Sequence, residues 1–319
     1  MCIIRTALTL HVFLSTANAF NASTGCGKAL GYGIKKGGTG SSNTITLTSG
    51  GITRSFLLHI PTNYNINSAR GLIFGFHGRG ATASKQEVLS SFSDPYFNRD
   101  NLAVYPQGID NQWQGDPEAR TNDVQFTLDI IDYLAPRYCI NQDAIFSTGK
   151  SNGGGFSLNI IACDPVASTR IAAFASNSGA YYATTPSTGC APLTVALPCN
   201  PGRSTVPILE IHGSADDVIP YYGGDRRGKC LPTVPHFVTE WAKRNGLGST
   251  NITTNTYDRQ VHKHEFGQAQ GKVGLVTSYW VNALTHSWAS TIANTDTATP
   301  TFVNATSIMM DWFNKWNLP

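Results

Sequence analysis

Charged side chains are scarce in this chain. Of its 319 residues only 13% are Asp, Glu, Lys or Arg, and the formal net charge is +3. No cluster of Lys and Arg accompanies this small excess, so the composition does not indicate nucleic acid as a partner. Long apolar runs are missing too, since no segment reaches the roughly 20 apolar residues that cross a bilayer. We therefore expect a soluble protein with neither a nucleic-acid nor a membrane partner.

Metal-binding patterns are also absent. The chain contains no Cys-x-x-Cys pair and no His-Glu-x-x-His, so we expect no zinc site and no other metal or cofactor. His262 and His264 alternate on an expected strand and share one face, as in a metal pair, but no third ligand accompanies them. A solvated strand face is the expected interpretation.

The N-terminal segment is typical of a secretory signal peptide. Arg5 supplies the positive start, residues 7–14 form a short apolar stretch, and Ala17-Asn18-Ala19 offers small residues for cleavage. We predict a signal peptide over residues 1–19 and a secreted, extracellular mature chain. Because no repeat or linker interrupts it, residues 20–319 are expected to form a single domain, as a monomer.

The cysteines agree with export. Cys2 lies in the expected signal peptide, and the remaining six predict three disulfides whose pairing the sequence leaves open among 15 possibilities. These six are Cys26, Cys139, Cys163, Cys190, Cys199 and Cys230. The Asn-x-Ser/Thr triplets at Asn21, Asn251 and Asn304 are candidate glycosylation sites.

Short apolar runs alternate with helical patterns along the chain. The expected strands are residues 52–60, 72–77, 102–105, 144–147, 171–175, 208–212 and 275–284, and the expected helices are residues 123–138, 151–163, 236–245 and 306–316. This alternation predicts an α/β fold in which a mostly parallel sheet carries helices on both faces. In such sheets ligands bind at the carboxyl ends of the strands, so chemistry is expected just after each apolar run.

Ser151 has the surroundings of a nucleophile. It lies in Gly149-Lys150-Ser151-Asn152-Gly153, between an expected strand and an expected helix. A tight strand-to-helix turn exposes a serine hydroxyl, and the flanking glycines make room for the strained backbone. The backbone N–H of Asn152 is the expected first donor to an oxyanion, because the following helix directs its N-terminus at the site.

Two later strand ends supply partners for such a serine. Asp216 and Asp217 follow the strand that ends at His212, and either could orient a histidine base. His286, in Thr285-His286-Ser287-Trp288, is the last histidine and completes the chain order Ser, Asp, His.

The other histidines are expected to be structural. His59 lies within a strand, His212 packs under the acid loop, and His236 starts a helix.

The glycine-rich loop His77-Gly78-Arg79-Gly80 follows another expected strand. In a serine hydrolase this loop supplies the second oxyanion N–H, for which Arg79 and Thr82 are the candidates. His77 is expected to shape the loop by hydrogen bonding.

Aromatic and polar side chains lie at the end of the next expected strand and just after it. Trp113, Gln107 and Tyr105 are candidates for lining a substrate pocket, although core packing and loop hydrogen bonding explain each of them equally well.

With these residues in place, the chain resembles fungal feruloyl esterases of the type C/D group, which are related to polyhydroxybutyrate depolymerase-like and acetylxylan esterases. The matching stretches are residues 76–80, 104–108, 113–116, 149–155, 212–220 and 286–288. The resemblance implies one α/β-hydrolase catalytic domain without a separate carbohydrate-binding module. Its His-Gly-x-x-Asp pattern implies Asp216 as the acid and His286 as the base. One departure is Ala289, where the family usually has proline.

The resemblance also implies a substrate. It is the hydroxycinnamate esters, such as ferulate and p-coumarate, of plant cell-wall arabinoxylan or pectin. The enzymatic alternatives are an acetylxylan or a polyhydroxyalkanoate esterase with the same three residues. A third alternative is a non-catalytic carbohydrate-binding homologue on a hydrolase fold, against which the intact Ser, Asp and His argue.

Overall fold

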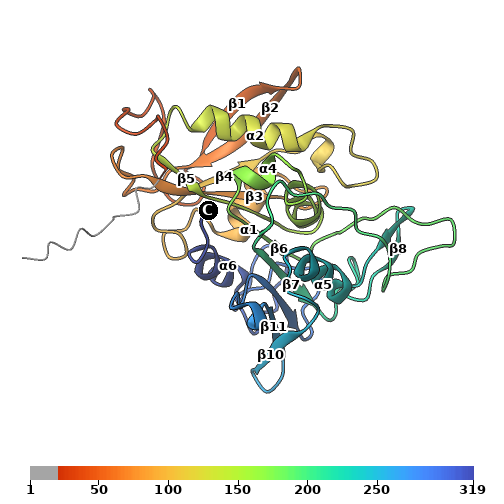
Figure 1. The fold of residues 1–319 in the computed structure, drawn as a ribbon. Helices are drawn as coiled ribbons and strands as arrows, with labels where there is room; N and C mark the ends of the chain where they lie inside the picture. The colour runs from red at the N-terminus through yellow and green to blue at the C-terminus, as the bar shows by residue number, and fades with distance from the viewer. Residues whose placement is uncertain (1–20) are drawn as a thin grey trace, which may run out of the picture.

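The computed structural model describes residues 21–319, so the expected signal peptide over residues 1–19 lies outside the described residues. The described chain builds a ten-stranded sheet in the order β1-β2-β4-β3-β5-β6-β7-β12-β11-β10, beside the small hairpin β8-β9 (Figure 1). The strands are β1 (Asn43–Ser49), β2 (Ile52–His59), β3 (Arg70–Phe76), β4 (Leu102–Pro106), β5 (Ile140–Gly149), β6 (Ala173–Asn177), β7 (Ile208–Gly213), β8 (Gly224–Arg226), β9 (Lys229–Leu231), β10 (Asn251–Thr256), β11 (Val261–Phe266) and β12 (Val276–Val281).

Helices connect β3 to β4, β4 to β5, β5 to β6 and β9 to β10. The α-helices are α1 (Ala83–Ser90), α2 (Asp123–Leu134), α3 (Asn152–Gly155), α4 (Ala167–Arg170), α5 (Val234–Arg244) and α6 (Ala305–Phe313). Three further turns are η1 (Ile109–Asn111), the π-helical η2 (Phe156–Ile161) that continues α3, and η3 (Gln268–Gln270).

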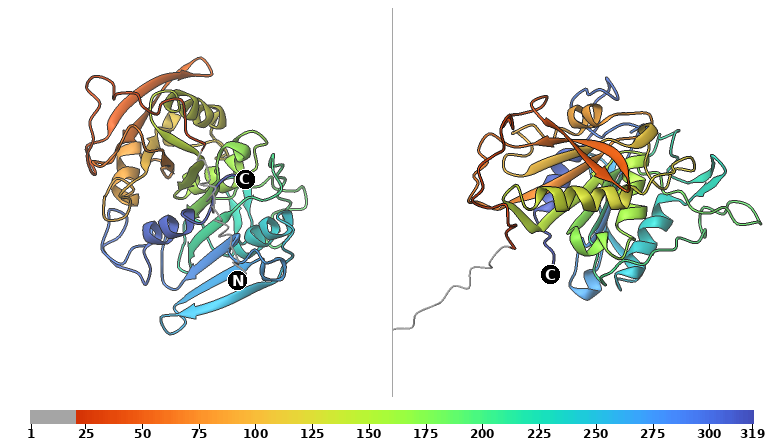
Figure 2. Two further views of the ribbon diagram at one scale, coloured as in Figure 1. Left: turned by 60° about the vertical axis from the view of Figure 1, so that its left-hand side comes forward. Right: turned by 90° about the horizontal axis from the view of Figure 1, so that it is seen from above.

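The centre of the sheet is parallel. Strands β4, β3, β5, β6, β7 and β12 all run in one direction. Antiparallel strands close both edges, β1 and β2 on one side and β11 and β10 on the other. Figure 2 shows these two hairpins, orange and light blue, at opposite ends of the molecule. The prediction of a mostly parallel sheet is confirmed.

Alternate residues of the central strands belong to two hydrophobic cores, one on each face of the sheet. In β3, Leu72 and Phe74 join the core beneath α2, η2 and α5, whereas Ile73 joins the core beneath α1 and α6. Successive side chains of a strand point to opposite faces, so a strand buried on both sides is apolar throughout. Helices therefore cover both faces, as expected for the α/β-hydrolase fold.

Some element ends differ from the sequence-based expectation. The last central strand stops at Val281 rather than continuing to residue 284, and Ala283 there adopts a φ of 55°. Helix α2 stops at Leu134 because Pro136 cannot continue it. The pattern also missed α1, whose first turn is capped by the Thr82 side chain.

Three disulfides link the six described cysteines, as predicted. They join Cys26 to Cys139, Cys163 to Cys199 and Cys190 to Cys230. Among residues 21–319, no helix is long and apolar enough to span a bilayer.

Candidate active site

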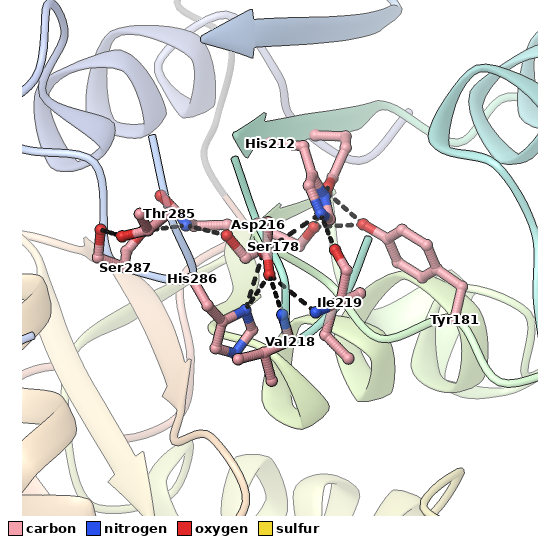
Figure 3. Close-up of polar contacts among 12 residues, drawn as sticks. Ser178, Tyr181, His212, Asp216, Val218, Ile219, Thr285, His286 and Ser287 are labelled. Atoms are coloured by element: carbon pink, nitrogen blue, oxygen red, sulfur yellow. Dashed lines mark hydrogen bonds and ion pairs between the residues drawn. The ribbon is translucent and has the colours of Figure 1, made fainter. Parts of the chain in front are cut away.

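Three strands bring their carboxyl ends to one region of the molecule. Ser151 follows β5, Asp216 follows β7 and His286 follows β12. Ser151 and His286 line the same cavity of about 730 Å³. Asp216 lies behind His286, and its carboxylate faces the imidazole ring (Figure 3). The structure therefore brings together the three residues that the sequence singled out.

Ser151 sits in a sharp turn between β5 and α3. Its backbone has φ 54° and ψ −121°, a conformation that residues other than glycine rarely adopt. Two hydrogen bonds hold this strained turn, from Lys150 N to the carbonyl of Phe76 and from Ser151 N to the carbonyl of Asn177, both 3.1 Å. Backbone strain that the surrounding contacts hold in place is a feature of functional sites.

Glycines beside Ser151 allow this close packing. A Cβ at Gly149 would approach the carbonyl oxygen of Phe76 to 2.7 Å, and a Cβ at Gly154 would approach Cβ of Ser176 to 2.9 Å. At Gly155 a Cβ would collide with the carbonyl of Ala180. The glycines therefore allow the turn and the helix to pack closely against the neighbouring strands.

Asp216, not Asp217, faces the histidine. Asp216 Oδ1 accepts the backbone N–H groups of Val218 at 3.0 Å and Ile219 at 2.8 Å, and Asp216 Oδ2 accepts Nδ1–H of His286 at 2.8 Å. Asp217 is exposed. Burial opposes ionisation of Asp216, but hydrogen bonds from His212 and His286 hold the pKa of this carboxyl well below its usual range. Asp216 is therefore ionised and fixed at neutral pH.

Asn177, at the end of β6, holds the His286 loop. Its side chain donates to the carbonyl of Ser287 at 2.9 Å and accepts the N–H of Ala289 at 2.9 Å. Its carbonyl also binds Ser151 N. One fully buried residue thus connects the loop that carries the histidine with the turn that carries the serine.

Lys150 and Asp296 make a second connection. Lys150 Nζ lies 2.6 Å from Asp296 Oδ2, and the same oxygen accepts the N–H of Trp288 at 2.9 Å. Both charged residues line the cavity. The residue next to Ser151 is therefore tied to the segment that follows His286.

The loop after β3 contacts the serine turn. A Cβ at Gly78 would lie 3.5 Å from Cβ of Ser151, and Arg79 lines the cavity. Thr82 caps α1, where its hydroxyl accepts Lys85 N. Of the two candidates for the second oxyanion donor, Arg79 is thus placed at the cavity and Thr82 at the helix cap.

His77 shapes this loop, as expected. Its Nδ1 lies 2.8 Å from the carbonyl of Gly78, and its Nε2 accepts the N–H of Gly108 at 3.0 Å. Burial lowers the pKa of His77 to about 4, so the ring is neutral and can accept that hydrogen bond.

The three expected pocket residues lie away from the cavity wall. Trp113 is fully buried, stacks on Phe156 and donates Nε1–H to the carbonyl of His77 at 2.8 Å. Tyr105 is fully buried and its hydroxyl bonds Ser93, while Gln107 accepts Ala83 N. This placement corrects the expected substrate-pocket role, because all three side chains support the fold beneath the site.

Ion pairs connect the cavity rim to the β8–β9 hairpin. Arg227, in the turn of this hairpin, lies 3.3 Å from Asp116 and 2.8 Å from Glu118. Arg79 bonds the same two carboxylates, at 3.5 Å and 2.6 Å. The four side chains join the loop after β3 to the hairpin across the rim.

The other histidines keep to structural positions. His59 is buried in β2, and the N–H of His236 bonds the Thr233 cap of α5. His262 stacks on Trp280, and His264 Nδ1 bonds Thr253. No group of three His, Cys, Asp or Glu side chains within residues 21–319 is placed to hold a metal ion.

Known esterases resemble this chain in sequence. No family model matches the chain. Feruloyl esterase C of Emericella nidulans, however, is 30% identical over 223 residues, which cover 67% of this chain and 72% of that protein. The chain belongs to the feruloyl esterase family. It is therefore a carboxylic ester hydrolase.

Other relatives of the esterase agree. A probable feruloyl esterase C of Aspergillus niger is 29% identical over 68% of this chain and 73% of its own length. Feruloyl esterase D of Neurospora crassa is 29% identical, and the match covers 62% of each chain.

Solved structures support the fold of the esterase. An acetyl xylan esterase from Aspergillus awamori superposes with a TM-score of 0.61 at 16% identity, over 86% of this chain and 99% of that one. A ferulic acid esterase from Anaeromyces mucronatus, in complex with ferulic acid, has a TM-score of 0.51 at 14% identity, over 90% and 92% of the two chains. At such identities the likeness shows the α/β-hydrolase fold alone.

Sequence reasoning missed several residues of the esterase that support the site. Asn177 is the last residue of β6, so the rule that places chemistry at strand ends applies to it as well. Asp296 carried no signal, because it lies in a long loop and its partner Lys150 is distant in sequence.

Proposed function

We propose that this esterase hydrolyses ferulate and other hydroxycinnamate esters of plant cell-wall polysaccharides through Ser151, His286 and Asp216. One observation carries the proposal: the ring of His286, bound by Asp216, lies on the wall of the cavity that Ser151 also lines. The names of the relatives supply the substrate class. Feruloylated arabinoxylan or pectin is the expected natural substrate.

The proposed reaction has two steps. His286, oriented by Asp216, takes the proton of Ser151 as its hydroxyl oxygen attacks the ester carbonyl. The backbone N–H groups of Asn152 and Arg79 are proposed to stabilise the oxyanion. His286 then gives the proton to the departing sugar alcohol, and water hydrolyses the acyl-enzyme to release the acid.

A rate comparison tests the substrate class. We expect measurable kcat/KM on methyl ferulate, caffeate, p-coumarate and sinapate, and release of ferulate from feruloylated arabinoxylan or pectin. Hydrolysis of acetylated xylan with no turnover of any of the four methyl esters would contradict the proposal.

The acetylxylan or polyhydroxyalkanoate alternative has one observation in its favour. Among the described residues, Tyr182 is the only Phe, Tyr or Trp that lines the cavity. A small acyl group needs no flat aromatic surface, whereas a hydroxycinnamate gains from one.

A non-catalytic carbohydrate-binding role would instead show as failure of an organophosphate to label Ser151.

We also propose that the esterase is secreted and extracellular. Three disulfides support an oxidising compartment. Of the candidate glycosylation sites, Asn21 and Asn251 are exposed, and Asn251 starts β10, the edge strand. Mass spectrometry of protein secreted by a fungal host tests both points: we expect a mature N-terminus near Phe20 and a glycan on Asn251.

A further inference from the structure

A buried chain of polar side chains continues behind Asp216 (Figure 3). His212 lies next in this chain, with Nε2 3.4 Å from Asp216 Oδ2 and 2.8 Å from the carbonyl oxygen of Ile219. On its other side Nδ1 lies 2.7 Å from Oε1 of Glu210. His212 and Glu210 are completely buried. Such a chain is costly to bury and calls for an explanation.

The contacts of His212 decide its protonation. Both ring nitrogens face acceptors, a carboxylate at Nδ1 and a carbonyl with a second carboxylate at Nε2. A neutral imidazole has one N–H, so it would turn a lone pair toward one of these acceptors. With Glu210 as a carboxylate, only the imidazolium, with two N–H groups, satisfies both sides.

The hydrogen bonds that Glu210 accepts favour its carboxylate form. Its second oxygen, Oε2, accepts hydrogen bonds from the hydroxyls of Tyr181 and Ser176. A carboxylate that receives two hydroxyl donors on one oxygen and an imidazolium N–H on the other is fully satisfied. Burial lowers the pKa of His212, but hydrogen bonds to Asp216 and Glu210 outweigh burial and raise this pKa to about 10.

The charges then alternate along this row of buried side chains, from negative Glu210 through positive His212 to negative Asp216. If Glu210 were neutral, the charge of His212 would cancel that of Asp216, and Asp216 would stabilise a protonated His286 less. With Glu210 ionised, the three groups sum to one negative charge beside His286. Resting on the triad proposed above, we propose that His212 and Glu210 are positioning residues: His212 is an imidazolium that fixes Asp216 and its loop, and Glu210 balances its charge.

Other groups near His212 leave this balance unchanged. The Tyr221 ring lies 5.9 Å from the His212 ring, and Tyr181 bonds Glu210. Burial raises the pKa of both tyrosines well above the ordinary range, so both are neutral. In the sheet, Ser176 on β6 pairs with Glu210, and Trp280 on β12 pairs with His212. Neither side chain carries a charge.

The ring protonation can be observed directly on the wild-type protein, without any activity. At about pH 9 an ordinary histidine, with a pKa near 6.5, is neutral. We expect long-range ¹H–¹⁵N NMR spectra at this pH to show both ring nitrogens of His212 protonated, with assignment by the His212→Gln variant. A neutral His212 ring at this pH would overturn the proposal, whatever the substrate of the enzyme.

Variants test the charge balance through the acid limb of the pH profile of kcat/KM, which reports protonation of the free base. Glu210→Gln removes a negative charge, so the limb is expected to move to lower pH by about half a unit or more. His212→Gln removes a positive charge, so the limb is expected to move to higher pH. The double variant restores the net charge and is expected to return the limb toward its wild-type position. A purely structural role would not produce opposite shifts that cancel.

Two controls accompany these variants. Glu265→Gln removes a carboxylate that pairs with Lys263 on β11, and it is expected to leave the limb unmoved. Stoichiometric labelling of Ser151 by an organophosphate reports the proposed nucleophile independently, so failure of the triad is distinguished from failure of the charge balance. If Ser151 is labelled and the limb stays at its wild-type position in both single variants, the positioning role is wrong.

Discussion

The carbonyl oxygen of Asn177 accepts the backbone N–H of Ser151 at 3.1 Å. The side chain of Asn177 bonds Ser287 and Ala289, on the loop that carries His286. A single buried residue thus sets the separation of the turn and the loop whose side chains must react together.

Replacement of Asn177 by Asp is expected to slow catalysis without weakening substrate binding. The aspartate would turn an acceptor toward the carbonyl of Ser287 and release the His286 loop. Because small displacements of reacting groups are costly, kcat should fall roughly 100-fold. Steady-state kinetics on methyl ferulate measure this effect, with Asn255→Asp on exposed β10 as the matched control. Equal kcat values for the two variants would refute the role of Asn177.

The two adjacent aspartates are expected to differ greatly. Asp216→Asn removes the carboxylate that orients His286, so kcat should fall by roughly 10⁴-fold. Asp217→Asn changes an exposed side chain and should have little effect. Rates of both variants on methyl ferulate make the comparison, and a larger loss at position 217 would reverse the assignment.

Stability is expected to fall as the pH decreases from about 6.5 to 4. Burial lowers the pKa of His59 and of His77 to about 4, whereas an unfolded histidine has a pKa near 6.5. Between these values the unfolded chain binds protons that the native state does not. Each histidine therefore reduces the free energy of unfolding by up to about 1.4 kcal/mol per pH unit as the pH falls.

His59→Leu isolates one of these contributions. Both ring nitrogens of His59 lack a hydrogen-bond partner among the described residues, so leucine removes no such bond. Denaturant unfolding at several pH values should show a shallower loss of stability in the variant than in the wild type. Identical slopes would mean that His59 does not titrate as its burial implies.

Two disulfides of similar loop length allow a matched comparison. Cys163–Cys199 and Cys190–Cys230 span 36 and 40 residues, so loss of either is expected to cost about 4 kcal/mol by the chain-entropy relation. Cys230 lies in β9, whose hairpin partner β8 places Arg226 on the cavity wall. Serine replacement of the Cys190–Cys230 pair should therefore reduce kcat/KM more than replacement of the other pair. Equal losses of kcat/KM would show that the disulfide near the hairpin has no special influence on the site.

The sheet and the main site residues were predictable because their signals are local. The strand cores of β3 and β4 are apolar runs, and Ser151 lies in a glycine-flanked pentapeptide. Ser151, Asp216 and His286 each follow a strand, and the ends of these strands meet at one edge of a parallel sheet.

Long-range partnerships were not predictable from local patterns. Glu210 and His212 alternate along β7 within an apolar run, and only the packed sheet shows that they point toward Tyr181 and Asp216. Trp113 resembled a pocket residue because aromatic side chains suit both cores and binding sites. Its stacking on Phe156 depends on how two distant segments pack, which no single segment encodes.

The assignment of Ser151 as the nucleophile is tested most directly by turnover of methyl ferulate by Ser151→Ala, measured beside the wild-type enzyme. Thermal unfolding should first confirm that the variant is folded. We predict that the rate falls by roughly 10⁶-fold, to the limit of detection, and that organophosphate labelling disappears with it. A folded Ser151→Ala variant that turns over methyl ferulate at a near-normal rate would contradict the assignment.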